Sequence, residues 1–231
     1  MLLHMQGPTW EPNSRWSLPV EGYGDAVVIS PQSTSPAPVV IVLHGAWDRP
    51  EWVCDVYAKV TTGREWVVCL RGKLRPEVPP DGARWTLGTV KETEDELNAV
   101  LTSLRSRVGD RAAPGIAVLS GFSKGASHAA ALSRREPDRF RRLLLVEGGL
   151  QLRTLTARKT AGQRIAMACG TQRCIQRAKK ACAKYQRLGG ACFLRSNLAV
   201  GHSYNSPFAN MGSRLYHWLN SDQSLTAPNR K

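Results

Sequence analysis

Strand-like and helix-like segments alternate along this chain, and the alternation limits its fold more than any other feature. The run Val39–Leu43 is unbroken and apolar, which is typical of a parallel strand covered on both faces. Strands alternating with helical segments predict βαβ units on a mostly parallel sheet. We expect strands at 39–43, 66–70, 115–119, 143–146, 165–169 and 191–195, and helices at 51–61, 91–107, 126–135, 174–188 and 213–220.

The net charge of the chain is +14 and is unevenly distributed. Residues 134–187 hold fifteen basic and three acidic side chains, a net charge of +12. Such a segment is either a solvated surface of an arginine-rich protein or a surface that attracts nucleic acid, anionic lipid or acidic substrates. The 42% hydrophobic content excludes a mainly disordered, collagen-like or coiled-coil chain. No apolar run approaches the ~18 residues of a membrane-spanning helix.

The 231 residues suit one large α/β domain or two small ones, and no linker or internal repeat divides them. We expect an irregular N-terminal lead-in at 1–24 with one strand around 16–20. A single domain should then span 25–220, followed by a flexible tail at 221–231.

Six cysteines at irregular positions permit three disulfides. We expect disulfides and an extracytoplasmic location, and the alternative is buried free thiols in a cytoplasmic protein. The first residues lack the charged start and apolar stretch of a secretory signal, so the extracytoplasmic prediction refers to a mature form. Because the spacings include no Cys-x2-Cys pair and no compact Cys/His cluster, we expect no metal.

Residues 121–125 form a Gly-x-Ser-x-Gly motif between a predicted strand and a predicted helix. In that context the motif predicts a tight turn that lifts the hydroxyl of Ser123 above the strand end. The helix start presents backbone N–H groups where an oxyanion would form, and the N–H of Lys124 is the first candidate donor. The alternative is an ordinary glycine-rich turn.

From this motif onward the chain resembles the α/β-hydrolase family, over about residues 39–219. The resemblance implies an α/β-hydrolase three-layer sandwich, with a mostly parallel sheet of about eight strands and helices on both faces. The segment 150–164 is short, so we expect no large cap domain and an open or shallow site. His44-Gly45-Ala46-Trp47 is similar to the family's oxyanion loop, which makes the N–H of Ala46 the second donor, or that of Trp47 if the loop is shifted.

The candidate base is His202, which follows the last predicted strand, and the order Ser…acid…His agrees with the family pattern. His44 is expected to support its loop, and His128 and His217 to serve packing or the surface. Where the family often places its acid, this chain has Arg173.

The interval between Ser123 and His202 contains three carboxylates, Glu136, Asp138 and Glu147. The first two are expected at the far end of the helix after Ser123. Glu147 follows a strand end, as in some family members, so it is the candidate acid that would orient His202. The alternative for Glu147 is a loop carboxylate paired with an arginine.

The aromatic residues Trp47, Trp85 and Tyr204 are candidates for lining the substrate pocket, although an aromatic in such loops is as often packing. Proximity in the fold of the family also suggests three disulfides, namely Cys54–Cys69, Cys169–Cys174 and Cys182–Cys192.

The resemblance implies a cofactor-independent serine hydrolase acting on small carboxylic esters through a Ser-His-Glu triad. One alternative is a single-domain, oligopeptidase-like serine peptidase. The other is a catalytically degenerate hydrolase fold that acts as a basic binding module for an anionic surface. Charge alone, without a nucleic-acid-binding motif, does not indicate a specific nucleic-acid partner.

Overall fold

The computed structural model describes residues 10–149, 162–204 and 206–221. The strands are β1 (Arg15–Leu18), β2 (Ala26–Ile29), β3 (Val39–Leu43), β4 (Trp66–Cys69), β5 (Lys73–Leu74), β6 (Trp85–Thr86), β7 (Val118–Phe122), β8 (Arg142–Val146), β9 (Arg164–Cys169) and β10 (Ala191–Ser196). The helices are α1 (Pro50–Val60), α2 (Val90–Val108), α3 (Lys124–Arg135), α5 (Gln172–Arg187) and α6 (Ser206–Asn220), with a short 3-10 turn at Gly109–Arg111.

Within these ranges, eight strands form one sheet in the order β1-β2-β4-β3-β7-β8-β9-β10. The strands from β4 to β10 in that order are all parallel. β1 and β2 extend one edge in antiparallel pairing, and β5 and β6 form a separate hairpin. The predicted mostly parallel α/β sheet is therefore confirmed.

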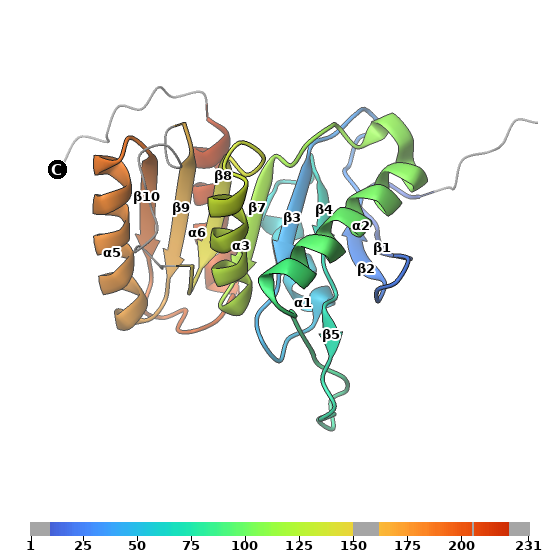
Figure 1. Ribbon diagram of the computed structural model, residues 1–231, viewed down its shortest axis with the longest axis horizontal. Coiled ribbons are helices and arrows are strands. Elements are labelled where there is room, and N and C mark those ends of the chain that lie inside the picture. The colour runs from blue at the N-terminus through green and yellow to red at the C-terminus, as the bar shows by residue number, and fades with distance from the viewer. Residues whose placement is uncertain (1–9, 150–161, 205, 222–231) are drawn as a thin grey trace, which may run out of the picture.

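The sheet is the middle of three layers, with helices on both faces (Figure 1). α2, α3 and α5 pack on one face, where Leu97, Ala126 and Ala178 belong to one hydrophobic cluster. α1 and α6 pack on the other, where Val53 and Leu215 belong to a second cluster. Parallel strands need such covering on both sides because neither of their faces is polar.

β3 illustrates why this sequence forms a buried central strand. Its five side chains are at most 2% exposed, and they alternate between the two clusters. Burying a valine or leucine side chain contributes about 1.5–3 kcal/mol, so the strand is stabilised from both layers. β-branched side chains also favour the extended backbone.

The predicted strand at 115–119 was wrong by three residues, since β7 covers Val118–Phe122. Gly115 has φ +85° and turns the chain before the strand. Pairing with β3 then continues as far as Gly121, opposite Leu43. The glycine of the motif is thus part of the strand, where its missing side chain leaves room for α3.

α3 also begins at Lys124 rather than at residue 126, directly after Ser123. α6 begins at Ser206, seven residues before the predicted start, and has Pro207 in its first turn, where proline is tolerated. Gly212 lies inside this helix and lets Val60 of α1 approach closely.

The expected strand around 16–20 occurs as β1 at Arg15–Leu18, within the segment predicted as a lead-in. The first nine residues, most of the segment 150–164 and the tail from 222 lie outside the described residues. Among the helices described, none is both long and apolar enough to cross a membrane.

The six cysteines form the three pairs that were expected from proximity. Cα atoms are 5.9 Å apart in Cys54–Cys69, 5.5 Å in Cys169–Cys174 and 5.2 Å in Cys182–Cys192. The first pair joins α1 to β4, the second brackets the turn between β9 and α5, and the third joins α5 to β10. These separations are those of disulfide bonds.

Candidate active site

Ser123 occupies a sharp turn between β7 and α3. Its φ is +53°, in the left-handed region of backbone conformation that residues other than glycine rarely adopt. Its N–H donates to the carbonyl of Val146 at 2.8 Å. A side chain at Gly121 would collide with the backbone of Gly125, and one at Gly125 with the backbone of Leu43. The motif therefore supplies the close packing that holds the serine in this strained position.

His202 follows β10 and lies beside Ser123. Its Nε2 is 3.1 Å from Oγ of Ser123, a distance suited to a hydrogen bond. The His202 ring packs against Phe122, with ring centroids 5.0 Å apart. About half of its side-chain surface, 53%, stays exposed, so a substrate has access to the ring.

Glu147 is the third member of this group. It follows β8 with φ +51°, and its carboxylate is only 2% exposed. Oε2 lies 3.1 Å from Nδ1 of His202. The chain thus brings Ser123, His202 and Glu147 into one hydrogen-bonded line, although they follow three different strands.

The Glu147 carboxylate is held at the start of α5. Oε1 accepts hydrogen bonds from the N–H groups of Gly170 and Thr171, the latter at 2.9 Å, and Oε2 accepts from the Thr171 hydroxyl at 2.9 Å. These donors and the positive end of the helix dipole stabilise a negative charge there. Arg173, at the position where a family acid was expected, is exposed on α5.

Ala46 and Lys124 follow the ends of β3 and β7. Lys124 is the first residue of α3, and its ammonium donates to the carbonyl of Leu87 and to Oγ1 of Thr86 at 3.2 Å. Burial lowers the pKa of the Lys124 side chain, and Arg75 adds to that effect. The role of the two N–H groups as oxyanion donors stays a prediction.

Asp48 anchors the loop that contains Ala46, and sequence reasoning missed it. Its carboxylate accepts hydrogen bonds from the N–H of Gly45 at 3.1 Å, the N–H of Arg49 at 2.8 Å and the hydroxyl of Tyr204. Its backbone pairs with Trp85 in both directions. Asp48 is 7% exposed, so these bonds replace the water that its charge has lost.

The three predicted pocket residues differ in their surroundings. Trp47 is 44% exposed, with the Arg75 guanidinium 5.4 Å from its ring centroid. Trp85 is half-buried, with Arg71 at 4.9 Å. Tyr204 packs edge-on against Phe122 at 4.9 Å and bonds Asp48, so it supports the loops.

The histidines at positions 44 and 128 form their hydrogen bonds with groups other than Ser123. Both ring nitrogens of His44 face carbonyls, of Gly45 at 2.7 Å and of Arg71 at 2.8 Å, which agrees with the loop-supporting position expected for it. His128 bonds Oγ1 of Thr93 at 3.0 Å, and burial lowers its pKa to about 4.

The sulfurs of Cys169 and Cys174 and a carboxylate oxygen of Glu147 lie within 4.8 Å of one another. Since these sulfurs bond each other, they cannot act as thiolate ligands for a metal.

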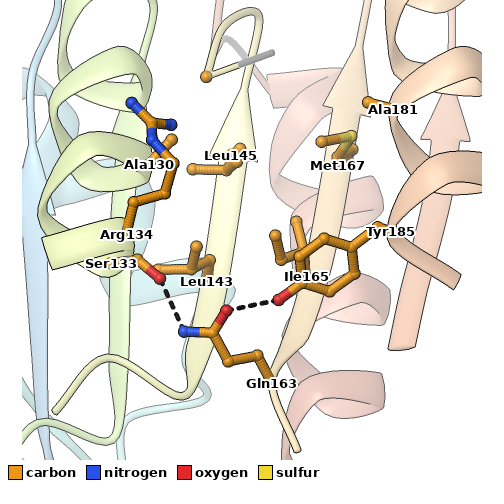
Figure 2. A pocket seen from close by; sticks show the side chains of 11 residues that line it. Ala130, Ser133, Arg134, Leu143, Leu145, Gln163, Ile165, Met167, Ala181 and Tyr185 are labelled. Atoms are coloured by element: carbon orange, nitrogen blue, oxygen red, sulfur yellow. Dashed lines mark hydrogen bonds between the residues drawn. The ribbon is translucent and has the colours of Figure 1, made fainter. Parts of the chain in front are cut away.

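A separate cavity lies between α3 and α5, over β8 and β9 (Figure 2). Its walls include Leu143, Leu145 and Met167, and its polar end is a chain from Tyr185 through Gln163 to Ser133. Because this lining contains none of Ser123, Glu147 and His202, the cavity is not part of the candidate active site.

No family model and no curated protein matches this chain. Solved structures do match its fold. A Bacillus cereus carboxylesterase shares 17% identity over 84% of this chain and 93% of its own, with a TM-score of 0.60. A ferulic acid esterase shares 17% identity over 89% of this chain and 95% of its own, with a TM-score of 0.62. The Staphylococcus aureus fluorophosphonate-binding serine hydrolase F shares 10% identity over 90% of this chain and 98% of its own, with a TM-score of 0.63. The chain therefore has the α/β-hydrolase fold.

Proposed function

We propose that this protein is a serine hydrolase that cleaves carboxylic esters through an acyl-enzyme. The observation that carries the proposal is the line of hydrogen bonds from Ser123 through His202 to Glu147. A serine hydroxyl, an imidazole and a buried carboxylate in that order form the arrangement used for nucleophilic acyl transfer. Neighbours of the same fold that are esterases agree with the proposal.

In the proposed mechanism, Oγ of Ser123 attacks the ester carbonyl while Nε2 of His202 takes the hydroxyl proton. The N–H groups of Ala46 and Lys124 donate to the oxyanion of the tetrahedral intermediate. His202 then gives its proton to the leaving alcohol, which departs as the carbon–oxygen bond breaks. His202 next deprotonates a water molecule, whose oxygen attacks the carbonyl carbon of the acyl-enzyme. His202 then returns this proton to Oγ of Ser123 as the bond between that oxygen and the acyl carbon breaks, and the carboxylic acid leaves.

Glu147 has two functions in this scheme. Its bond to Nδ1 fixes the His202 tautomer that leaves Nε2 free to accept a proton from Ser123. Its buried charge also stabilises the imidazolium that forms during the reaction. The donors from Gly170 and Thr171 keep the carboxylate in place.

The test is the substitution Ser123→Ala, with Ser106→Ala on the exposed surface of α2 as a matched control. Ser123→Ala should lower turnover of a short p-nitrophenyl ester by several orders of magnitude and abolish fluorophosphonate labelling. The control should retain both. Unchanged turnover in Ser123→Ala would refute the proposal.

The same residues could cleave an amide, so the peptidase alternative is tested by offering short peptides beside the esters. Turnover of peptides but not esters would favour it. A catalytically degenerate binding module would show neither activity. Against this alternative stands the intact geometry around Ser123.

The proposed location is extracytoplasmic, because all six cysteines lie in pairs at disulfide distance. The proposed chemistry uses side chains and backbone donors of this chain only and requires no cofactor. Mass spectrometry of unreduced peptides tests the location: three cross-linked peptide pairs support it, and six free thiols contradict it.

A further inference from the structure

The exposed face of α5 carries a line of positive charge that the proposed function does not use. Its cations occur at alternating spacings of four and three residues, so they fall within about 80° of one another around the helix axis and extend over about 21 Å. We call this line the α5 basic stripe; its residues are Arg173, Arg177, Lys180, Lys184 and Arg187.

The stripe points away from the core. The buried residues of α5, among them Ala178, Ala181 and Tyr185, pack on the sheet from another side of the helix. All stripe residues are exposed except Lys184, which is half-buried. α5 lies at one end of the molecule, beside the edge strand β10 (Figure 1).

The fold itself does not explain this charge. α5 contains no acidic residue, and the ion pairs between described residues include none of Arg173, Arg177, Lys180 and Arg187. Like charges three and four residues apart destabilise a helix. Arg173 also stands in the first turn, where the helix dipole disfavours a cation. The stripe therefore costs stability, and a binding role accounts for it.

We propose that the α5 basic stripe binds a linear acidic polysaccharide, independently of ester hydrolysis. A line of cations about 5 Å apart along the helix matches a chain with regularly spaced carboxylates or sulfates. The exposed large hydrophobic side chains of the described chain are Tyr23, Trp47, Trp52, Leu74, Val78 and Leu198, and none lies on α5.

This distribution argues against two other partners. A helix that lies on a membrane inserts apolar side chains, which the exposed face of α5 lacks. Single-stranded nucleic acid is held by aromatic stacking, which this face also lacks. The three cysteine pairs further favour an oxidising compartment, where polysaccharides are the abundant linear polyanions.

The experiment measures binding of the intact protein to fluorescently labelled polygalacturonate by anisotropy, at low and at physiological salt. The stripe variant carries four substitutions to glutamine, and Lys184 is kept because it has a contact within the protein. The control variant loses the same charge from exposed arginines elsewhere. The stripe variant is R173Q/R177Q/K180Q/R187Q, and the control is R64Q/R105Q/R107Q/R214Q.

The wild type should bind with an affinity that falls as salt rises. The stripe variant should lose at least about tenfold in affinity and show a shallower salt dependence, whereas the control should lose about threefold or less. Ester turnover should be unchanged in both variants, and Ser123→Ala should bind as the wild type does. If the protein did not hydrolyse esters, the expected binding results would stay the same, so the two proposals are tested separately.

Several outcomes would overturn the proposal. Equal losses in the stripe and control variants would mean that net charge alone drives binding. Stronger stripe-dependent binding to vesicles of anionic phosphatidylglycerol or to a single-stranded oligonucleotide would assign the stripe to those partners instead. If the stripe serves binding alone, removal of its charges should leave the melting temperature unchanged or raise it. A lower melting temperature in the stripe variant would show that the charges stabilise the fold.

Discussion

The Glu147 carboxylate lies 3.1 Å from Nδ1 of His202, and the donors that hold it come from the start of α5. The candidate acid Glu147 therefore follows β8, while the residues that hold its carboxylate occupy the turn after β9, where a family acid was expected. A carboxylate moved by one strand can still reach the same histidine, because the carboxyl ends of adjacent parallel strands share one edge of the sheet.

Glu147→Gln should lower kcat on a short ester by about 10³- to 10⁴-fold, because a neutral amide neither stabilises the imidazolium nor enforces the tautomer of His202. Glu136→Gln is the matched control. Glu136 pairs with Arg139 at the far end of α3, 3.3 Å away, and its loss should leave kcat unchanged. Steady-state kinetics distinguishes the two. The reverse pattern would reassign the acid.

Cys169→Ser/Cys174→Ser should lower activity as well as stability, because this pair brackets the turn whose N–H groups hold Glu147. Closing such a short loop is worth about 2 kcal/mol in the chain-entropy account. Cys182→Ser/Cys192→Ser should lower the melting temperature similarly but leave kcat unchanged well below that temperature. Equal kcat in both double variants would show that the turn keeps its shape without the disulfide.

Tyr204→Phe should keep the ring packing on Phe122 but remove the hydrogen bond to Asp48. Because that bond joins the loop containing Ala46 to the loop containing His202, we expect kcat to fall about tenfold with little change in KM, and stability to fall by about 2 kcal/mol. Kinetics and urea unfolding measure the two effects. The control is Tyr23→Phe, at a tyrosine that is 40% exposed, and it should change neither kcat nor stability. A change in KM without a change in kcat in Tyr204→Phe would instead place Tyr204 in the substrate pocket.

His128 should make the folded state sensitive to acid. Burial lowers its folded pKa to about 4, whereas its unfolded pKa is about 6.5. Between these values the unfolded chain binds a proton that the folded chain excludes, so this contribution to stability is lost as pH falls through the window. Urea unfolding at several pH values in this window gives the free energy of unfolding as a function of pH. The slope of this dependence should be smaller in His128→Asn than in the wild type, by up to about one proton. Identical slopes in variant and wild type would contradict the assignment.

The sequence alone determined the layered α/β architecture, because apolar runs and helical periodicity depend on neighbouring residues. It also made Ser123 the candidate nucleophile, because the glycines around it are a local requirement of the turn. The resemblance to the α/β-hydrolase family made His202, which follows the last strand, the candidate base. Glu147 became the candidate acid because it follows a strand end, as in some members of that family, and because the interval between Ser123 and His202 contains only two other carboxylates.

Only the tertiary structure decided where β7 ends, because its register is set by pairing with β3 rather than by its own composition. It also revealed Asp48 and Thr171, whose partners lie 156 and 24 residues away along the chain. A side chain that acts through a distant contact leaves no periodic or local signal. The sequence therefore located the candidate reacting groups, and the fold determined what holds them in place.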